Sequence, residues 1–380
     1  MKKIKFILLG VLLLIFTLSF VCFPTTVSVS AFQSSAKGMC VLEKNSKRII
    51  YSKNENLKLP MASTTKIVTA IAVLQNCKDL DKYIQVDDNS IGIEGTSIYL
   101  RNGEIIRVKD LLYGLMLRSG NDAATALAYH IGGSIEGFTK LMNELAVKIG
   151  ASNSNFANPH GLHADNHYTT AYDLALITSY ALNNPIFKEI VSTKNYVIEA
   201  TNKSDKRFLT NKNKLLSTLN GCCGVKTGFT KKAGRCLVSA CERNDTTLVC
   251  VVLNCGPMFE ESAEMLDYGL NIYKNVKIID KNKEIYNEYI IDEAQGKLYL
   301  YADEDFSYPL MDDELDKLKL EYFVKLDDAK EGDEVGEIKI FFDNHLIKTL
   351  KLFTMNKIDK LIDSKTLSIS EILWEDKIWE

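Results

Sequence analysis

A serine and a lysine three positions apart open the first long helix that the sequence predicts. Ser63 and Lys66 would share one helix face, one turn apart, so the amine can approach the hydroxyl. A serine hydroxyl becomes a good nucleophile only when a neighbouring base takes its proton. A lysine can be that base only where burial or another cation lowers its pKa. Together the two indicate acyl transfer, although each taken singly is more typical of a helix cap and a solvated first-turn lysine.

Two further tripeptides carry polar side chains to places where a substrate could meet them. Ser119-Gly120-Asn121 separates two predicted helices and exposes a hydroxyl and a carboxamide, although these residue types also form ordinary interhelical turns. Lys226-Thr227-Gly228 lies on a predicted strand, where a cation and a hydroxyl could bind a carboxylate and the glycine permits close approach. An edge strand with a protective lysine would look the same. Each motif is weak alone, but their order on helix, interhelical loop and strand is specific.

The elements that must position these motifs follow from hydrophobic periodicity. Apolar residues at helical spacing predict helices over 63–76, 109–117, 122–131, 138–149, 171–182 and 262–273. Alternating and β-branched runs predict an early hairpin (39–42 with 48–51) and strands over 224–230, 236–241 and 246–253. Short turns at Lys231-Lys232 and Asn244-Asp245 join the last three strands. Beyond about residue 275 the pattern is that of a small all-β domain.

The three motifs in this order match the set found in serine penicillin-recognising enzymes. With the stretches 59–66, 117–123, 157–162 and 224–237, the sequence resembles the D-alanyl-D-alanine carboxypeptidases, the low-molecular-mass penicillin-binding proteins of peptidase family S11. The resemblance covers residues 37–273 strongly and the β-domain less specifically. It implies an α+β fold, in which a serine β-lactamase/transpeptidase-like domain (32–274) precedes a small all-β domain (275–353).

The resemblance also implies catalytic roles. Ser63 would attack the carbonyl between the two terminal D-alanines of a peptidoglycan stem peptide and hold the acyl group, with Lys66 as proton acceptor. Ser119 would relay a proton to the leaving amine, and Asn121 would orient Lys66 and the substrate amide. Water would then release the shortened peptide, which limits cross-linking of the cell wall. Penicillins and other β-lactams would acylate Ser63 because they mimic the same dipeptide.

Substrate-binding positions follow from the same resemblance. Lys226 and Thr227 would bind the terminal carboxylate, beside Gly228. The oxyanion would lie between the backbone N–H groups of Ser63 and Phe229. No cofactor is implied.

Other functions remain open at this point. A class A β-lactamase would need a loop glutamate of the Glu-x-x-x-Asn kind, where this chain has Asn158-Pro159-His160. An endopeptidase that cuts cross-links would use the same residues. A non-catalytic wall-binding or β-lactam-sensing module would react with penicillin but release no D-alanine, and a purely structural protein would do neither.

The N-terminus predicts export. A basic start, Met1-Lys2-Lys3-Ile4-Lys5, precedes an uncharged stretch over 6–23, and small residues end at Ala31. We expect residues 1–31 to be a signal peptide, with an uncleaved anchor as the alternative, and the protein to act in the cell wall or at the outer face of the cytoplasmic membrane. Net charge is −3 and only seven of the 46 basic residues are arginine, which argues against a nucleic-acid surface.

The tail and the histidines give weaker signals. Residues 354–380 could form an amphipathic helix and touch the membrane peripherally, but four lysines against six acidic residues suit an anionic membrane poorly. His160, His163 and His167 lie in a segment with Pro159 and Gly161, which disfavours a helix that presents two rings to a metal, so no metal site is expected.

The cysteines cluster late in the chain, with six between Cys222 and Cys255. Their spacing argues against a four-thiolate metal site. If Lys231-Lys232 is a two-residue turn, Cys222 lies opposite Cys241, which makes this pair the first disulfide to test in an exported protein. Buried free thiols are the interpretation that the sequence favours.

Overall fold

The computed structural model describes residues 32–291, 294–325, 329–357 and 366–372, so the predicted signal peptide lies outside the described residues. The chain divides into Met1–Ser34 and a remainder from Ser35 onward. The described helices and strands all belong to that remainder.

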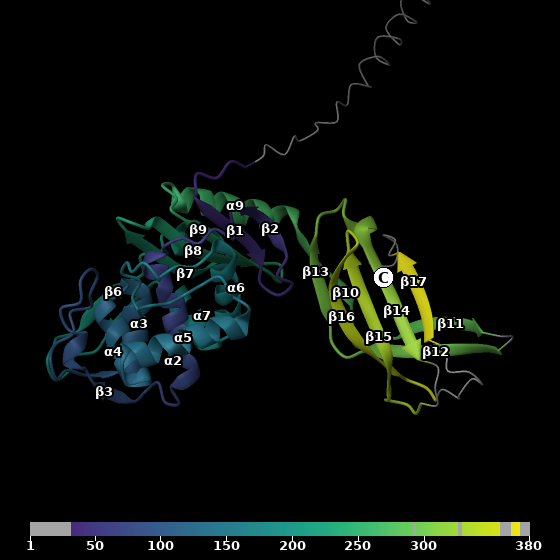
Figure 1. The fold of residues 1–380 in the computed structure, drawn as a ribbon, viewed down its shortest axis with the longest axis horizontal. Helices are drawn as coiled ribbons and strands as arrows, with labels where there is room; N and C mark the ends of the chain where they lie inside the picture. Colours follow the sequence, from purple (N-terminus) through teal and green to yellow (C-terminus); the bar gives the residue numbers. More distant parts are fainter. Residues whose placement is uncertain (1–31, 292–293, 326–328, 358–365, 373–380) are drawn as a thin grey trace, which may run out of the picture. The chain divides into compact units, whose positions relative to one another are not determined.

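A five-stranded antiparallel sheet organises the first part of the chain. Its order is β2-β1-β9-β8-β7, with β1 at Gly38–Glu43, β2 at Ile49–Lys53, β7 at Cys222–Thr230, β8 at Gly234–Arg243 and β9 at Thr246–Leu253. Strand β9 is buried along its whole length, as its unbroken apolar run predicts for a strand covered on both faces. Helix α9 (Met258–Ile272) packs on β8 and β9, whereas α6 (Ala171–Ala181) packs on β1 and β9 (Figure 1).

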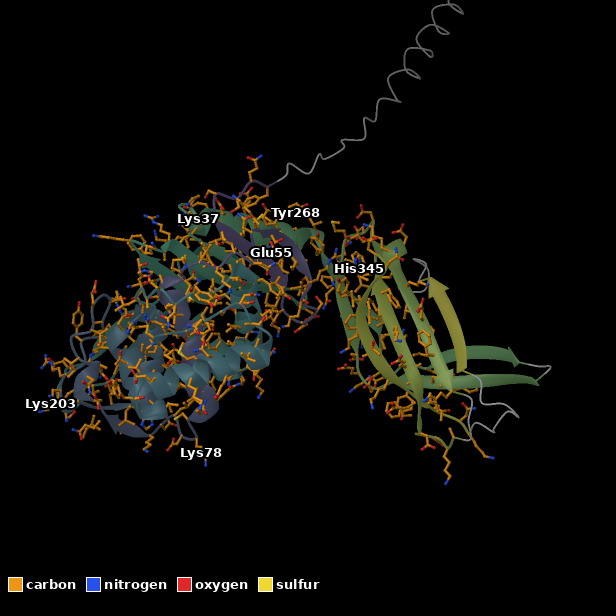
Figure 2. All side chains as sticks on the ribbon, viewed as in Figure 1. Lys37, Glu55, Lys78, Lys203, Tyr268 and His345 are labelled. Atoms are coloured by element: carbon orange, nitrogen blue, oxygen red, sulfur yellow. The ribbon has the colours of Figure 1, made fainter. Side chains whose placement is uncertain are left out.

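Other helices lie on the α6 side of the sheet, namely α2 (Lys66–Asn76), α3 (Val108–Tyr113), α4 (Asn121–Gly132), α5 (Ile135–Ile149) and α7 (Pro185–Ser192) (Figure 1). Shorter helical segments are η1 (Ala62–Thr65), η2 (Asp88–Ser90), η3 (Gly114–Arg118) and α8 (Leu215–Thr218). Short two-stranded sheets join β3 (Tyr83–Gln85) to β4 (Ile105–Arg107), and β5 (Asn195–Ile198) to β6 (Arg207–Thr210). Side chains fill the space between sheet and helices, and charged residues such as Lys78 and Lys203 point outward (Figure 2).

Local sequence explains where several helices begin. The side chain of Thr170 accepts a hydrogen bond from the backbone N–H of Asp173 and caps α6, which begins at the predicted position 171. Asn184 caps α7 in the same way, with Pro185 at the first helical position. The sequence pattern predicts a helix over 171–182 and none directly after it, so α7 is an additional helix.

The turn predicted at Lys231-Lys232 is wrong. Thr230 pairs with Gly234, so three residues intervene between β7 and β8. The register then shifts by one between Cys222 and Gly224, where Cys223 forms a β-bulge. The bulge compensates for the longer turn, and Cys222 therefore does lie opposite Cys241.

The last part of the chain is all-β, as predicted. A six-stranded antiparallel sheet has the order β11-β12-β16-β15-β14-β17, and a two-stranded sheet pairs β10 with β13. The strands are β10 (Lys274–Ile279), β11 (Ile285–Ile291), β12 (Ala294–Ala302), β13 (Phe306–Leu310), β14 (Leu318–Lys325), β15 (Glu334–Phe342), β16 (His345–Thr354) and β17 (Thr366–Ile372); η4 covers Leu315–Lys317.

The tail differs from the amphipathic helix considered for 354–380. Thr366–Ile372 forms strand β17, which pairs antiparallel with β14 along its length. Residues 366–370 alternate polar and apolar side chains, which is the period of a strand. Residues 358–365 and 373–380 lie outside the described part of the chain.

Candidate active site

The helix that carries Ser63 and Lys66 begins with a tight turn. Ser63 lies in the 3-10 segment η1, and Lys66 is the first residue of α2. The spacing of three brings the Lys66 Nζ to 3.0 Å from the Ser63 Oγ. Ser63 is half-buried, whereas Lys66 has no exposed surface. The amine that sequence spacing brought near the hydroxyl is therefore also removed from water.

Two more oxygen atoms surround the Lys66 amine. Its Nζ lies 2.7 Å from the Asn121 Oδ1 and 2.6 Å from the backbone oxygen of His160. These partners come from the start of α4 and from the loop before α6. The three partners bring together segments near residues 63, 121 and 160 around one nitrogen.

The turn between η3 and α4, at Ser119 and Gly120, is held by hydrogen bonds to the segment 94–96. The Nδ2 of Asn121 donates to the backbone oxygen of Glu94, and its backbone N–H donates to that of Thr96 at 2.7 Å. The hydroxyl of Thr96 donates to the backbone oxygen of Ser119 at 2.9 Å. Ser119 itself is buried and has φ 65°, in the left-handed region that L-residues seldom occupy. Strained backbone of this kind clusters at functional sites.

Two glycines allow the chain to pass close to Ser63. A Cβ added at Gly228 on β7 would lie 3.0 Å from the Ser63 nitrogen, so any side chain there would press on η1. Gly161 has φ 89°, and a Cβ there would lie 2.0 Å from the Ala62 oxygen. Gly228 follows Lys226 and Thr227, so this close approach brings the third motif against the first. Phe229, next along the strand, is 65% exposed.

Burial controls the charge of both lysines. It is the main cause that lowers the pKa of Lys66 well below its ordinary value, and the charge of Lys226 lowers it further. Lys226 is buried on β7, and its Nζ donates to the Thr227 backbone oxygen at 3.0 Å. Burial first, and the charge of Lys212 second, lower the pKa of Lys226 to about 7.

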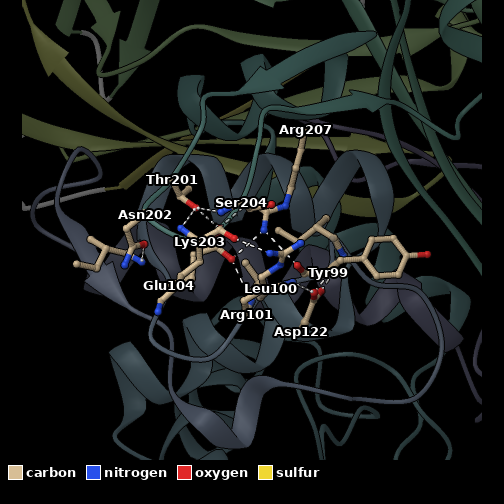
Figure 3. Close-up of polar contacts among 12 residues, drawn as sticks. Tyr99, Leu100, Arg101, Glu104, Asp122, Thr201, Asn202, Lys203, Ser204 and Arg207 are labelled. Carbon is tan, nitrogen blue, oxygen red and sulfur yellow. Dashed lines mark hydrogen bonds and ion pairs between the residues drawn. The ribbon is translucent and has the colours of Figure 1, made fainter.

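Two buried carboxylates, those of Asp122 and Glu104, fix the segment 97–104, which follows the residues that hold the turn between η3 and α4. Asp122, directly after Asn121, accepts hydrogen bonds from the Ser97 hydroxyl and from the backbone N–H groups of Ile98 and Leu100. Glu104 accepts hydrogen bonds from both terminal nitrogens of the Arg207 guanidinium, at 2.7 and 2.8 Å (Figure 3). The Thr201 hydroxyl and the Arg101 backbone N–H complete the partners of Glu104. The segment 97–104 is therefore anchored at both ends.

Glu104→Gln should lower the free energy of unfolding by about 3–5 kcal/mol, because it leaves the Arg207 guanidinium, whose side chain is only 11% exposed, without its counterion. Burial alone would raise the pKa of Glu104, but hydrogen bonds from Arg207 and Thr201 outweigh it and keep that pKa below its usual value. Urea denaturation measures the effect. Glu199→Gln, which breaks the exposed pair with Lys206, is the matched control and should change stability by at most about 1 kcal/mol. Equal losses in both variants would contradict the bracing role of Glu104.

The histidines have structural contacts. The Nε2 of His167 lies 2.8 Å from the Thr65 hydroxyl, and its Nδ1 accepts the Ala157 backbone N–H. Burial lowers the pKa of His167 to about 4. Across the described ranges, no group of three His, Cys, Asp or Glu residues is placed to hold a metal ion. Among those same residues, no helix combines the length and the apolar character needed to cross a membrane.

The structure thus brings together most residues that the sequence singled out. Ser63, Lys66 and Asn121 are in direct contact, Gly228 lies against η1, and Lys226 is close enough to shift the pKa of Lys66. The backbone oxygen of His160 and the carboxylate of Asp122 also contribute to the site, although the sequence analysis did not single them out. The sequence carried no signal for the first, because any residue type offers a carbonyl.

Comparison with known proteins identifies the family. The family model for D-alanyl-D-alanine carboxypeptidases, peptidase S11, matches residues 25–256. The chain belongs to peptidase family S11. A second model, for the C-terminal domain of penicillin-binding protein 5, matches residues 273–360 of this S11 peptidase. The resemblance drawn from the motifs and the expected α+β fold are both confirmed, and the protein is a serine-type D-alanyl-D-alanine carboxypeptidase.

Individual relatives of this S11 peptidase span both parts of the chain. It is 31% identical over 293 residues to the D-alanyl-D-alanine carboxypeptidase DacF of Bacillus subtilis, covering 75% of each chain. It is 30% identical over 357 residues to DacC of Escherichia coli, covering 89% of this chain and 88% of DacC. Among solved structures, penicillin-binding protein 5 of Haemophilus influenzae superposes with a TM-score of 0.73 at 27% identity, over 87% of this chain and all of that one.

Proposed function

We propose that this S11 peptidase removes the terminal D-alanine from peptidoglycan stem peptides through an acyl-enzyme on Ser63. The observation that carries the proposal is the Lys66 amine, which is fully buried and 3.0 Å from the Ser63 hydroxyl. A lowered pKa increases the fraction of the amine that is neutral, and the neutral form is the one that can act as a base.

The partners of Lys66 fit a neutral amine. A neutral amine has two N–H donors and one lone pair, whereas the charged form has three donors and no acceptor. The Asn121 Oδ1 and the His160 backbone oxygen can only accept, and they take both N–H groups. The lone pair is then left for the Ser63 hydroxyl, which donates its proton to Lys66 as the oxygen attacks the substrate carbonyl. Ser119 would carry that proton to the departing D-alanine.

Strand β7 supplies the groups that would hold the substrate. Lys226, when protonated, and Thr227 would bind the terminal carboxylate, because a charge-assisted hydrogen bond to a carboxylate is strong in a buried site. The backbone N–H groups of Ser63 and Phe229 would stabilise the oxyanion, and the close approach of Gly228 to η1 favours that geometry. Penicillins offer the same carboxylate and carbonyl, so we expect β-lactams to acylate Ser63.

A β-lactamase is less well supported by the same site. Rapid deacylation in that class needs a carboxylate that activates water near the acyl group. Here the backbone oxygens of Pro159 and His160 face α2, accepting the Thr69 hydroxyl and the Lys66 amine. A carbonyl cannot take up the proton of a water molecule, so we expect penicillin to be released slowly.

The test combines mass spectrometry with a product assay. The purified protein with benzylpenicillin should gain the mass of one penicillin, and a diacetyl-Lys-D-Ala-D-Ala peptide should release D-alanine. Both signals should disappear in Ser63→Ala and persist in Ser52→Ala, a serine on β2 that is half-buried outside the site. Labelling that persists in Ser63→Ala would reject the nucleophile. Penicillin labelling without D-alanine release would instead indicate a β-lactam-sensing module.

Export and cell-wall location belong to the same proposal. The basic start, apolar stretch and small residues of positions 1–31 are typical of a secretory signal, and the substrate lies outside the cytoplasm. Removal of the terminal D-alanine takes away the bond whose cleavage drives cross-linking, so the activity would limit cross-linking. The N-terminal sequence of the secreted protein checks the location: cleavage after Ala31 should leave Phe32 as first residue.

The two lysines predict a bell-shaped pH profile for kcat/KM. Acidification protonates Lys66 and removes the base, whereas a pH above about 7 removes the charge of Lys226 that binds the free carboxylate. D-alanine release measured from pH 5 to 10 should therefore decline above about pH 7, and a decline on the acid side marks the protonation of Lys66. Lys226→Arg, whose guanidinium stays charged, should lose the alkaline decline. A flat profile from pH 6 to 9 in the wild type would contradict these assignments.

A further inference from the structure

Two cysteines face each other near the open end of the hairpin that carries Lys226. Cys222 on β7 pairs with Cys241 on β8. The Glu242 backbone N–H donates to the Gly221 oxygen at 2.9 Å, which is the bond that flanks a non-hydrogen-bonded pair in an antiparallel ladder. Such pairs have Cα atoms about 4.5 Å apart, within the range of about 4.4–6.8 Å in which disulfides form. The backbone therefore already has a spacing that a cross-link needs.

The two thiols differ in ionisation and in access. The Cys241 side chain lowers the pKa of Cys222, whereas the Cys222 side chain and burial raise the pKa of Cys241. The Cys222 Sγ also lies 3.4 Å from the Gly224 backbone oxygen. Cys222 is half-buried, whereas Cys241 has no exposed surface. A thiol that is reachable and more readily ionised is the one that reacts first with an external disulfide.

We propose that Cys222 and Cys241 are a redox-active pair that a small external disulfide converts to a cross-strand disulfide. The Cys222 thiolate attacks one sulfur of the external disulfide, whose S–S bond breaks and releases one thiol after protonation. The Cys241 thiol then loses its proton and attacks the Cys222 sulfur, which releases the second external thiol. Two protein thiols are oxidised and one external disulfide is reduced to two thiols, so atoms and electrons balance.

The other nearby cysteine makes a poorer partner. Cys223 is the extra residue of the bulge, and its thiol donates to the Ala240 backbone oxygen at 3.5 Å. Burial raises the pKa of Cys223 to about 12, so little thiolate is available. Cys236 and Cys250 are fully buried in the sheet, out of reach of an external disulfide. The pairing is thus specific to Cys222 and Cys241.

The cross-link would restrain β7, the strand that carries Lys226 and is proposed to hold the substrate. β7 is the edge strand of its sheet, and β8 is the strand that pairs with it. The turn at 231–233 closes one end of the β7–β8 hairpin, and Lys226 and Gly228 lie between that turn and the cysteine pair. A disulfide at the other end would close the hairpin covalently, so the strand that holds Lys226 could no longer separate from β8 at that end.

The experiment maps disulfides in the purified full chain after equilibration with oxidised or reduced glutathione. Remaining thiols are trapped with iodoacetamide and the protein is digested with trypsin. Cleavage after Lys214, Lys226, Arg235 and Arg243 gives peptides 215–226 and 236–243, which each hold two cysteines. Oxidised wild type should yield the two peptides joined and lighter by two hydrogen atoms. The joined product should persist in Cys223→Ser and in Cys236→Ala, and disappear in Cys222→Ser and Cys241→Ser.

Three results would overturn the proposal. These are a joined product that survives in Cys222→Ser, an internal Cys222–Cys223 disulfide in peptide 215–226, or no cross-link in fully oxidised glutathione. A second measurement covers a variant that fails to fold: oxidation should raise the Tm of the wild type by roughly 3–8 °C, because a cross-link restricts the unfolded chain. Cys222→Ser should show no such shift. None of these readouts needs the catalytic activity, so a failure of the disulfide proposal can be distinguished from a failure of the proposed function.

Discussion

Lys66→Arg should slow the acylation of Ser63 by penicillin roughly 10²–10⁴-fold, the usual contribution of a general base. Arginine can donate to the same oxygens on Asn121 and His160, but it cannot lose its proton at any pH that the protein tolerates. Quenched-flow mixing followed by mass spectrometry measures the acylation rate. The slower acylation would therefore reflect the loss of proton transfer, because Lys66→Arg places a permanent positive charge at this position and still supplies hydrogen-bond donors.

A matched substitution separates chemistry from packing in this experiment. Lys148→Arg changes an exposed lysine on α5 and should leave the acylation rate unchanged. Thermal unfolding of Lys66→Arg shows whether the larger head group still fits the site. A folded Lys66→Arg protein that acylates at the wild-type rate would show that Lys66 is not the base.

Lys226→Met should have opposite effects on stability and on substrate turnover. Replacing a buried charged group by an apolar one of similar volume commonly stabilises a protein, here by about 1–4 kcal/mol. The same change removes the cation for the substrate carboxylate and should lower kcat/KM by roughly 10²–10³-fold, equivalent to about 3–4 kcal/mol. Denaturation and D-alanine release, measured on the same protein, test both effects.

The gain in stability should depend on pH in a defined direction. Lys226 has a pKa of about 7 in the native state and about 10.5 when unfolded, so between these values the unfolded state binds more protons. The cost of Lys226 to the native state is therefore full below pH 7 and declines as pH rises towards 10.5. The stability advantage of Lys226→Met should shrink over that interval, whereas Lys148→Met should show no such trend. An advantage that grows with pH would contradict the lowered pKa.

Much of the fold could be predicted because its signals are local. The helix at 171–182 shows in its apolar spacing and its Thr170 cap, and β9 in its unbroken apolar run. Helix α7 was not predicted because Asn184 and Pro185, which usually end a helix, here begin a new one. The amphipathic helix considered for the tail fails at Thr366–Ile372 because β14 offers this alternating segment a strand to pair with.

The hairpin at β7 and β8 shows how a correct pairing can follow from a wrong turn. Turn length and bulges both shift register by one residue, and the sequence does not show which of them occurs. The register shifts from the longer turn and from the bulge at Cys223 cancel. The predicted position of Cys222 opposite Cys241 across the strands is therefore confirmed, whereas the two-residue turn from which it was derived is wrong.

Residue types and their spacing were enough to select Ser63, Lys66, Ser119, Asn121 and Lys226-Thr227-Gly228 as candidates, because acyl transfer to a serine needs a nucleophile, a base and groups that bind the substrate. Their order along the chain added the resemblance to the family. Tertiary structure alone decided the environment that makes them useful. The lowered pKa of Lys66 comes from burial and from a lysine far away in sequence, and one of its partners is the backbone oxygen of His160. Desolvation and long-range charge depend on which surfaces fold together, and a carbonyl carries no residue signature, so neither can be derived from a local pattern.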